Sequence, residues 1–151
     1  MIIQTLKAFA LVLTLLPAAA EGISPTGSIQ VTTPQRLSLS LGAFSADGSL
    51  LGPSAGLLAR IEPGISGGKL HLGFRSTFSL LFLPVTSVDI TGALLQTWFD
   101  PWGGVESGQT YFGGEFRIGI RTVVATAGLY RHAAGEGEDG WIGSFGVGIG
   151  L

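Results

Sequence analysis

The sequence contains no cysteine among its 151 residues, and only 12 % of its residues are charged. Without cysteine, a disulfide framework and a thiolate metal site are both excluded. Ordinary soluble domains carry about 25 % charged residues, so this chain is unusually poor in charge. Its formal net charge of −2 also argues against nucleic-acid binding, which needs a basic surface.

Long apolar runs are missing as well. Beyond residue 20, no run approaches the roughly 20 apolar residues that a membrane-spanning helix needs. The mean hydropathy is nevertheless positive, at +0.50, and a soluble protein this apolar would expose adhesive surface. Helices and closed barrels are the two structures that satisfy their backbone in lipid. These absences therefore predict a membrane β-barrel.

The first twenty residues differ in composition from the rest. Lys7 supplies one positive charge, residues 8–16 form an apolar run, and residues 17–20 read Pro-Ala-Ala-Ala. This pattern is typical of a cleaved secretory signal peptide. The alternative is a single membrane anchor, for which the apolar run is too short. Cleavage after Ala20 leaves 151 − 20 = 131 residues, enough for one domain of an exported envelope protein.

Alternation with a period of two marks six segments of the remaining chain, and the last of them is Trp141–Leu151. Residues 78–83 and 123–132 are apolar or small on both faces, and they are assigned as strands partly because the strand count is then even. Such alternation predicts strands rather than helices. Residues 21–35, with two prolines, are predicted to be a periplasmic lead-in with at most a short strand at 29–33. Residues 36–151 are predicted to form one antiparallel up-and-down barrel of about eight strands, at 36–44, 54–62, 69–74, 78–83, 88–98, 113–121, 123–132 and 141–151.

Strand count and chain length agree. Eight strands leave about 16 residues per strand and connection, which suits strands of about 9 to 11 residues across a bilayer. With both termini in the periplasm, the outer connections are predicted at 45–53, 76–77, 99–110 and 133–140. The inner ones are predicted at 63–68, 84–87 and the bend near Thr122.

The inward-facing positions carry most of the charge. An eight-stranded barrel is just wide enough for side chains to fill its interior. Buried charges must pair, because an unpaired one is very costly. We therefore predict a structural network of charges in the lumen, formed by Arg60, Glu62, Lys69, His71, Arg75, Asp89, Glu115, Arg117 and Arg121. The alternative is a small anion site made by the arginine residues that find no partner.

Aromatic residues gather around the loop at 99–110 and at the start of the last strand. Aromatic side chains prefer the headgroup level of a bilayer, and membrane barrels carry girdles of them. The alternative is a set of rings that cap the core of a soluble sandwich. The predicted membrane-interface residues are Trp98, Trp102, Tyr111, Phe112 and Trp141.

Signal peptide, alternating strands, aromatic girdle and apolar last strand together resemble the small outer-membrane β-barrel class of Gram-negative bacteria. The resemblance implies an outer-membrane location, with membrane lipid and lipopolysaccharide as contacts. It also implies insertion by the barrel-assembly machinery, which in that class recognises a terminal Phe or Trp. This chain ends on Leu, and the corresponding assembly signal is Phe145, Val147, Ile149 and Leu151.

Several function classes remain open. A structural or interaction barrel with a filled lumen is favoured. A small pore or carrier would need an open lumen, for which the inner glycines of the last strand leave room. A soluble secreted barrel or sandwich that binds a ligand is the non-membrane alternative. The oligomeric state is left open.

Catalysis and metal binding receive little support from the sequence. A lipid hydrolase would need a nucleophile, a base and an orienting group in contact. The combination available for this is Ser144, His132 and Glu136. The two histidines, His71 and His132, are far apart in sequence and do not form a zinc motif. We therefore predict no catalytic residues, no metal and no cofactor.

Overall fold

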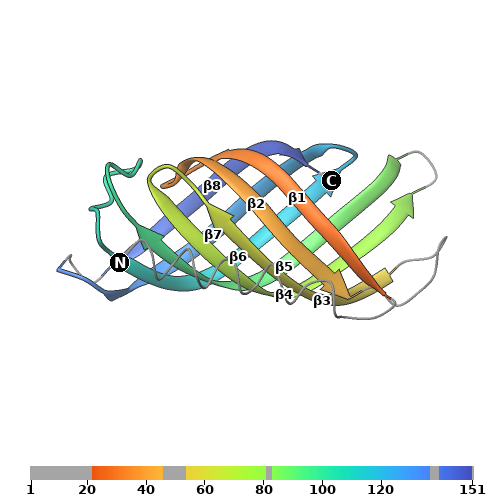
Figure 1. Cartoon of the computed structure of the whole chain (residues 1–151), viewed down its shortest axis with the longest axis horizontal. Helices are drawn as coiled ribbons and strands as arrows, with labels where there is room; N and C mark the ends of the chain where they lie inside the picture. Colours follow the sequence, from red (N-terminus) through yellow and green to blue (C-terminus); the bar gives the residue numbers. More distant parts are fainter. Residues whose placement is uncertain (1–21, 46–53, 81–82, 137–139, 151) are drawn as a thin grey trace.

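The computed structural model describes residues 22–45, 54–80, 83–136 and 140–150. The predicted signal peptide and Leu151 lie outside these residues. Eight antiparallel strands pair in sequence order and close into one barrel, which confirms the predicted all-β up-and-down architecture and the strand count (Figure 1). The strands are β1 Ile23–Thr32, β2 Arg36–Ser45, β3 Ser54–Pro63, β4 Gly67–Leu80, β5 Leu83–Thr97, β6 Thr110–Ile120, β7 Val123–Ala134 and β8 Trp141–Gly150. Within the described residues, no helix has the length and apolar character needed to cross a membrane.

The barrel begins earlier than the sequence indicated. Residues 21–35, predicted as a lead-in, contain β1, which pairs with β2 along its whole length and with β8 from Ser28 to Thr32. Pro25 therefore lies where β1 is paired on the β2 side alone. A proline is tolerated at such a half-paired position, because its missing N–H is not needed there.

The predicted fourth strand at 78–83 is not a separate strand. β4 runs on to Leu80 and forms a hairpin with β5, with a register shift between Phe78 and Leu80. The turns predicted at 76–77 and 84–87 are therefore wrong, since both segments lie within strands. Pro84 stands near the start of β5, a position that proline accepts. The count of eight is right because two errors cancel. β1 was missed, and the hairpin between β4 and β5 was counted as an additional strand.

The two ends of the barrel differ. The connections at 33–35, 64–66, 98–109 and 135–140 lie at one end, here called the loop end. The start of β1 and the end of β8 lie at the other end, the terminal end, as do the facing ends of β2 and β3, of β4 and β5, and of β6 and β7 (Figure 1). The loops predicted at 99–110 and 133–140 share an end, as expected. The loop predicted at 63–68 lies at the loop end instead of the inner side, because β1 precedes it. The loop predicted at 45–53 lies outside the described residues, apart from Ser45, where β2 ends at the terminal end.

The barrel is apolar outside and polar inside. Leu72 and Phe145 on the outer wall are 62 % and 66 % exposed, whereas Arg60 and His71 inside are 1 % and 0 % exposed. Strand alternation produces this division, since successive side chains point to opposite faces. The polarity is the reverse of that of a soluble β-barrel.

The inner glycines of β8 leave no open space. Gln30 and Thr32 of β1 lie over Gly148 and Gly146, and a Cβ at Gly148 would overlap the carbonyl oxygen of Ile29. The room in the lumen expected from these glycines is therefore taken up by the neighbouring strand.

We expect Gly148→Ala to lower the free energy of unfolding by about 1–3 kcal/mol, the usual cost of overpacking. Gly114→Ala is the matched control, because a Cβ there meets only the Thr91 carbonyl oxygen, at 3.8 Å. Urea unfolding of both variants in detergent micelles measures the difference. Equal stabilities would contradict the packing of β8 against β1.

Candidate functional site

The interior of the barrel holds a connected set of charges. Eight of the nine residues predicted to face the lumen are buried there, at no more than 5 % exposure. They come from four consecutive strands, β3 to β6, and are Arg60, Glu62, Lys69, His71, Arg75, Asp89, Glu115 and Arg117.

Glu115 on β6 is one centre of the network. Its Oε1 accepts a hydrogen bond from Arg60 Nη2 at 3.1 Å. Its Oε2 accepts bonds from Lys69 Nζ at 2.7 Å and from the Tyr130 hydroxyl at 2.9 Å. One buried carboxylate thus joins β3, β4, β6 and β7.

Asp89 on β5 is the second centre. Arg75 holds it with two bonds, from Nε at 2.7 Å and from Nη2 at 2.9 Å. Arg60 Nη1 donates a third, at 2.9 Å, and Arg117 Nε lies 3.9 Å away. Because Arg60 contacts both Asp89 and Glu115, the two centres form one network. Charge-assisted and bidentate bonds of this kind are the strong ones.

Other bonds cross the lumen between strands that are not neighbours. Lys69 Nζ on β4 donates to Ser144 Oγ on β8 at 2.9 Å, and these two strands are opposite each other in a ring of eight. Arg117 on β6 donates to Ser28 Oγ on β1 at 2.9 Å and to Ser40 Oγ on β2 at 3.4 Å. Side chains therefore bridge the interior from wall to wall.

An apolar cluster covers the network on the side of the loop end. Leu95, Tyr111 and Tyr130 are buried there, with Val105 and Ile142 packed against them. Tyr111 was predicted to lie at the membrane interface, and this is wrong, because the ring points inward and is 6 % exposed. Its ring meets His132 edge to face, with centroids 5.5 Å apart.

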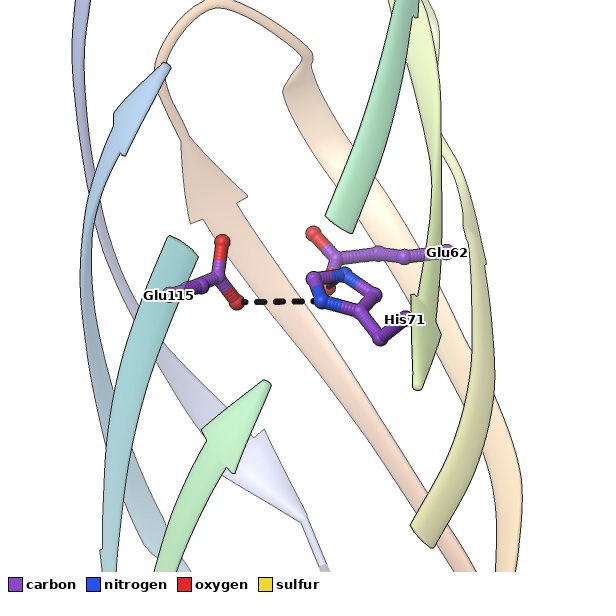
Figure 2. Close-up of side chains that lie close together, drawn as sticks. All are labelled: Glu62, His71 and Glu115. Carbon is purple, nitrogen blue, oxygen red and sulfur yellow. Dashed lines mark ion pairs between the residues drawn. The ribbon is translucent and has the colours of Figure 1, made fainter. Parts of the chain in front are cut away.

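Glu62, His71 and Glu115 form the group that most resembles a metal site (Figure 2). His71 lies between the two carboxylates, with Nε2 3.7 Å from Glu62 Oε2 and Nδ1 3.8 Å from Glu115 Oε1. One ligand atom from each residue lies within 4.8 Å of the others.

The surroundings of this group disfavour a divalent cation. Both oxygens of Glu115 already accept bonds from Arg60, Lys69 and Tyr130. The buried charges of the described residues are four cations (Arg60, Lys69, Arg75, Arg117) and three carboxylates (Glu62, Asp89, Glu115), an excess of one positive charge. A metal ion would increase that excess in a poorly solvated interior. The group therefore belongs to the ion-pair network.

Arg121 does not join the network, and its predicted place in the lumen is wrong. Arg121 and Thr122 form the two-residue turn between β6 and β7, since Ile120 pairs with Val123. Arg121 has a φ of 54°, as tight hairpin turns require, and its side chain is exposed. The turn interrupts the alternation one residue earlier than the sequence indicated.

The other predicted aromatics gather at the loop end. Phe112 and Trp141 are exposed on the outer wall, and Trp102 is exposed with Arg36 over its ring at 5.7 Å. Trp98 is half-buried, and its Nε1 donates to the Ile65 carbonyl at 2.9 Å.

The residues of the predicted assembly signal follow the outer face of β8. Phe145, Val147 and Ile149 are each at least 64 % exposed. Leu151, the fourth residue of that signal, lies outside the described residues.

The candidate hydrolase residues are not brought together. Ser144 pairs with Gly128 across the hairpin, four residues from His132, or about 13 Å along the strand. Ser144 is bonded to Lys69, and His132 Nε2 lies 2.8 Å from Gln109 Oε1. Glu136 is exposed beyond the end of β7.

Tyr130 and Arg131 were not predicted from the sequence. Residues 123–132 are small or apolar on both faces, so the phase of β7 could not be assigned. The paired strand resolves it, because Tyr130 lies opposite Gly113 on the inner face of β6.

The chain matches no protein-family model, no curated protein and no solved structure.

Proposed function

We propose that the mature protein is a small outer-membrane β-barrel with a closed lumen and a structural or interaction role, rather than a channel or an enzyme. The observation that carries the proposal is the inversion of polarity: exposed Leu, Ile, Val and Phe cover the outer wall, whereas charged side chains fill the interior.

The outer wall supports a lipid environment. Exposed large apolar side chains occur on all eight strands, including Ile29, Leu39, Leu57, Leu72 and Ile90. Monomeric soluble proteins rarely expose continuous apolar surface on this scale. Closure of the barrel satisfies the backbone without water, as a lipid environment requires. This favours a membrane barrel over a soluble binding protein.

The interior supports a closed barrel. A channel needs a continuous aqueous path, whereas Lys69, Ser144, Arg117 and Ser28 bond across the lumen and Leu95 and Tyr111 cover one side of the network. The same burial keeps His71 and the carboxylates from a substrate. His71 and the buried carboxylates are residue types suited to catalysis, but here they stabilise the folded barrel.

The loop end would then face outward, with the chain termini in the periplasm. Phe112, Trp141 and Trp102 would lie at the outer headgroup level, where aromatic rings are favoured. Membrane lipid and lipopolysaccharide are the expected contacts of this rim. The exposed apolar face of β8 would serve recognition by the barrel-assembly machinery.

The test is electrophoresis of the mature chain, refolded into lipid vesicles, with and without boiling. We expect the unboiled sample to migrate differently from the boiled one, because a folded membrane barrel resists detergent. We also expect vesicles that contain it to leak a small trapped solute no faster than empty vesicles. A shifted band with fast leakage would contradict the closed lumen. Solubility without detergent would contradict the membrane location.

A further inference from the structure

A shallow apolar groove crosses the outer wall over β5 to β8. Its volume is about 530 Å³, and its lining includes Ile90, Gly114, Phe116, Gly143 and Phe145.

A row of mostly small residues crosses this wall, and three of its members, Gly114, Leu129 and Gly143, line the groove. Gly92 pairs with Gly114, Gly114 with Leu129, and Leu129 with Gly143, so three of the four positions in this row lack a side chain. The next row toward the terminal end is Ile90, Phe116, Ala127 and Phe145. Bare backbone beside bulky rings makes the depression.

Two of the three missing side chains are not required by packing. A Cβ at Gly92 would meet only the Leu72 carbonyl oxygen, at 3.8 Å, and one at Gly114 only the Thr91 carbonyl oxygen, at 3.8 Å. This contrasts with the inner glycines, where a Cβ would overlap neighbouring atoms. The outer wall has room at Gly114 for a larger side chain or for a ligand.

Arg131 lies just above the groove. Among the strand residues that the structure describes, it is the one charged side chain on the outer face. It follows Leu129 by two residues, about 7 Å toward the loop end. Its register partners are Phe112 and Trp141, two exposed rings of the aromatic rim. No ion pair within the described residues neutralises it.

We propose that Arg131 and this groove form a binding site for one anionic phosphorylated lipid, with a headgroup phosphate on the guanidinium and an acyl chain along the glycine row. The proposal rests on the proposed membrane location. A guanidinium forms paired charge-assisted bonds with phosphate oxygens, and its position among aromatic rings matches the headgroup level. An acyl chain suits the apolar lining of the groove below.

The position of the charge favours lipid over a second copy of the chain. In a two-fold dimer, this wall would meet the same wall of its partner. Arg131 would then face apolar surface or another Arg131, and an unpaired buried charge is strongly unfavourable. A lipid supplies the opposite charge and the apolar tail together.

Native mass spectrometry of the mature protein in detergent, with phosphatidylglycerol added, tests the site. We expect the natural chain to retain one phosphatidylglycerol and to prefer it to phosphatidylcholine. Arg131→Gln should bind phosphatidylglycerol about tenfold more weakly, since charge-assisted bonds are lost. Gly114→Leu should fill the groove and also reduce retention. Gly27→Leu, at an outward glycine of β1 away from the groove, is the matched control.

Equal retention by Arg131→Gln, by Gly114→Leu and by the natural chain would overturn the proposal. Each variant is first checked for the heat-dependent band shift that reports a folded barrel. A shifted band without selective retention refutes the lipid site alone. The lack of a band shift in the natural chain refutes the membrane location, and the lipid site with it.

Discussion

Leu72→Arg is expected to lower the free energy of unfolding in lipid vesicles by about 2–4 kcal/mol, the cost of a cation deep on the lipid face of a barrel. Leu72 lies near the middle of β4, points outward and is 62 % exposed. In a membrane this position faces hydrocarbon, where a guanidinium loses its hydration. Urea unfolding of the vesicle-bound protein, followed by the heat-dependent band shift, measures the loss.

Ile65→Arg is the matched control for this change. Ile65 is also an exposed apolar side chain, at 57 %, but it lies in the turn between β3 and β4 at the loop end. The same substitution there should change stability by no more than about 0.5 kcal/mol. If Leu72→Arg were equally harmless, the outer wall would face water.

Glu115→Gln is expected to destabilise the barrel by about 3–5 kcal/mol, because it removes one partner from a buried network of charges. The carboxylate accepts bonds from Arg60, Lys69 and Tyr130, and the interior already holds one excess positive charge. The variant would hold four buried cations against two carboxylates. Urea unfolding in detergent micelles measures the effect.

Glu136→Gln makes the same chemical change at an exposed position beyond β7 and should leave stability nearly unchanged. The comparison separates the buried pairing from the net charge of the protein. A loss below about 1 kcal/mol for Glu115→Gln would mean that water enters the lumen and solvates the two cations. That result would also weaken the case for a closed barrel.

Much of the barrel could be predicted from alternation alone. Where one face is apolar and the other charged, as in Lys69 to Arg75, a period of two assigns strand and phase together. The same residues then identify the lumenal network, because a narrow barrel forces inward charges to pair. Eight of nine predicted lumenal residues are buried for this reason.

Alternation fails where both faces have similar side chains or where a turn shifts the phase. β7 shows the first case, so Tyr130 was not recognised as a partner of Glu115. Arg121 shows the second, because a two-residue turn takes it out of β6. β1 was not predicted, because Pro25 argues against a strand that is paired on both sides. At Pro25, β1 is paired with β2 alone, and this half-pairing follows from the closed barrel and not from the local sequence.

The orientation of the outer wall toward lipid is tested most directly by spin labels on single cysteines. The chain has no cysteine of its own, so each label reports one position. A label at Phe145 in vesicles should be relaxed by oxygen, which concentrates in lipid, and protected from a water-soluble nickel reagent. A label at Ile65 should show the reverse. If the nickel reagent reached both labels equally, the wall would be in water, and the account of a membrane barrel would be wrong.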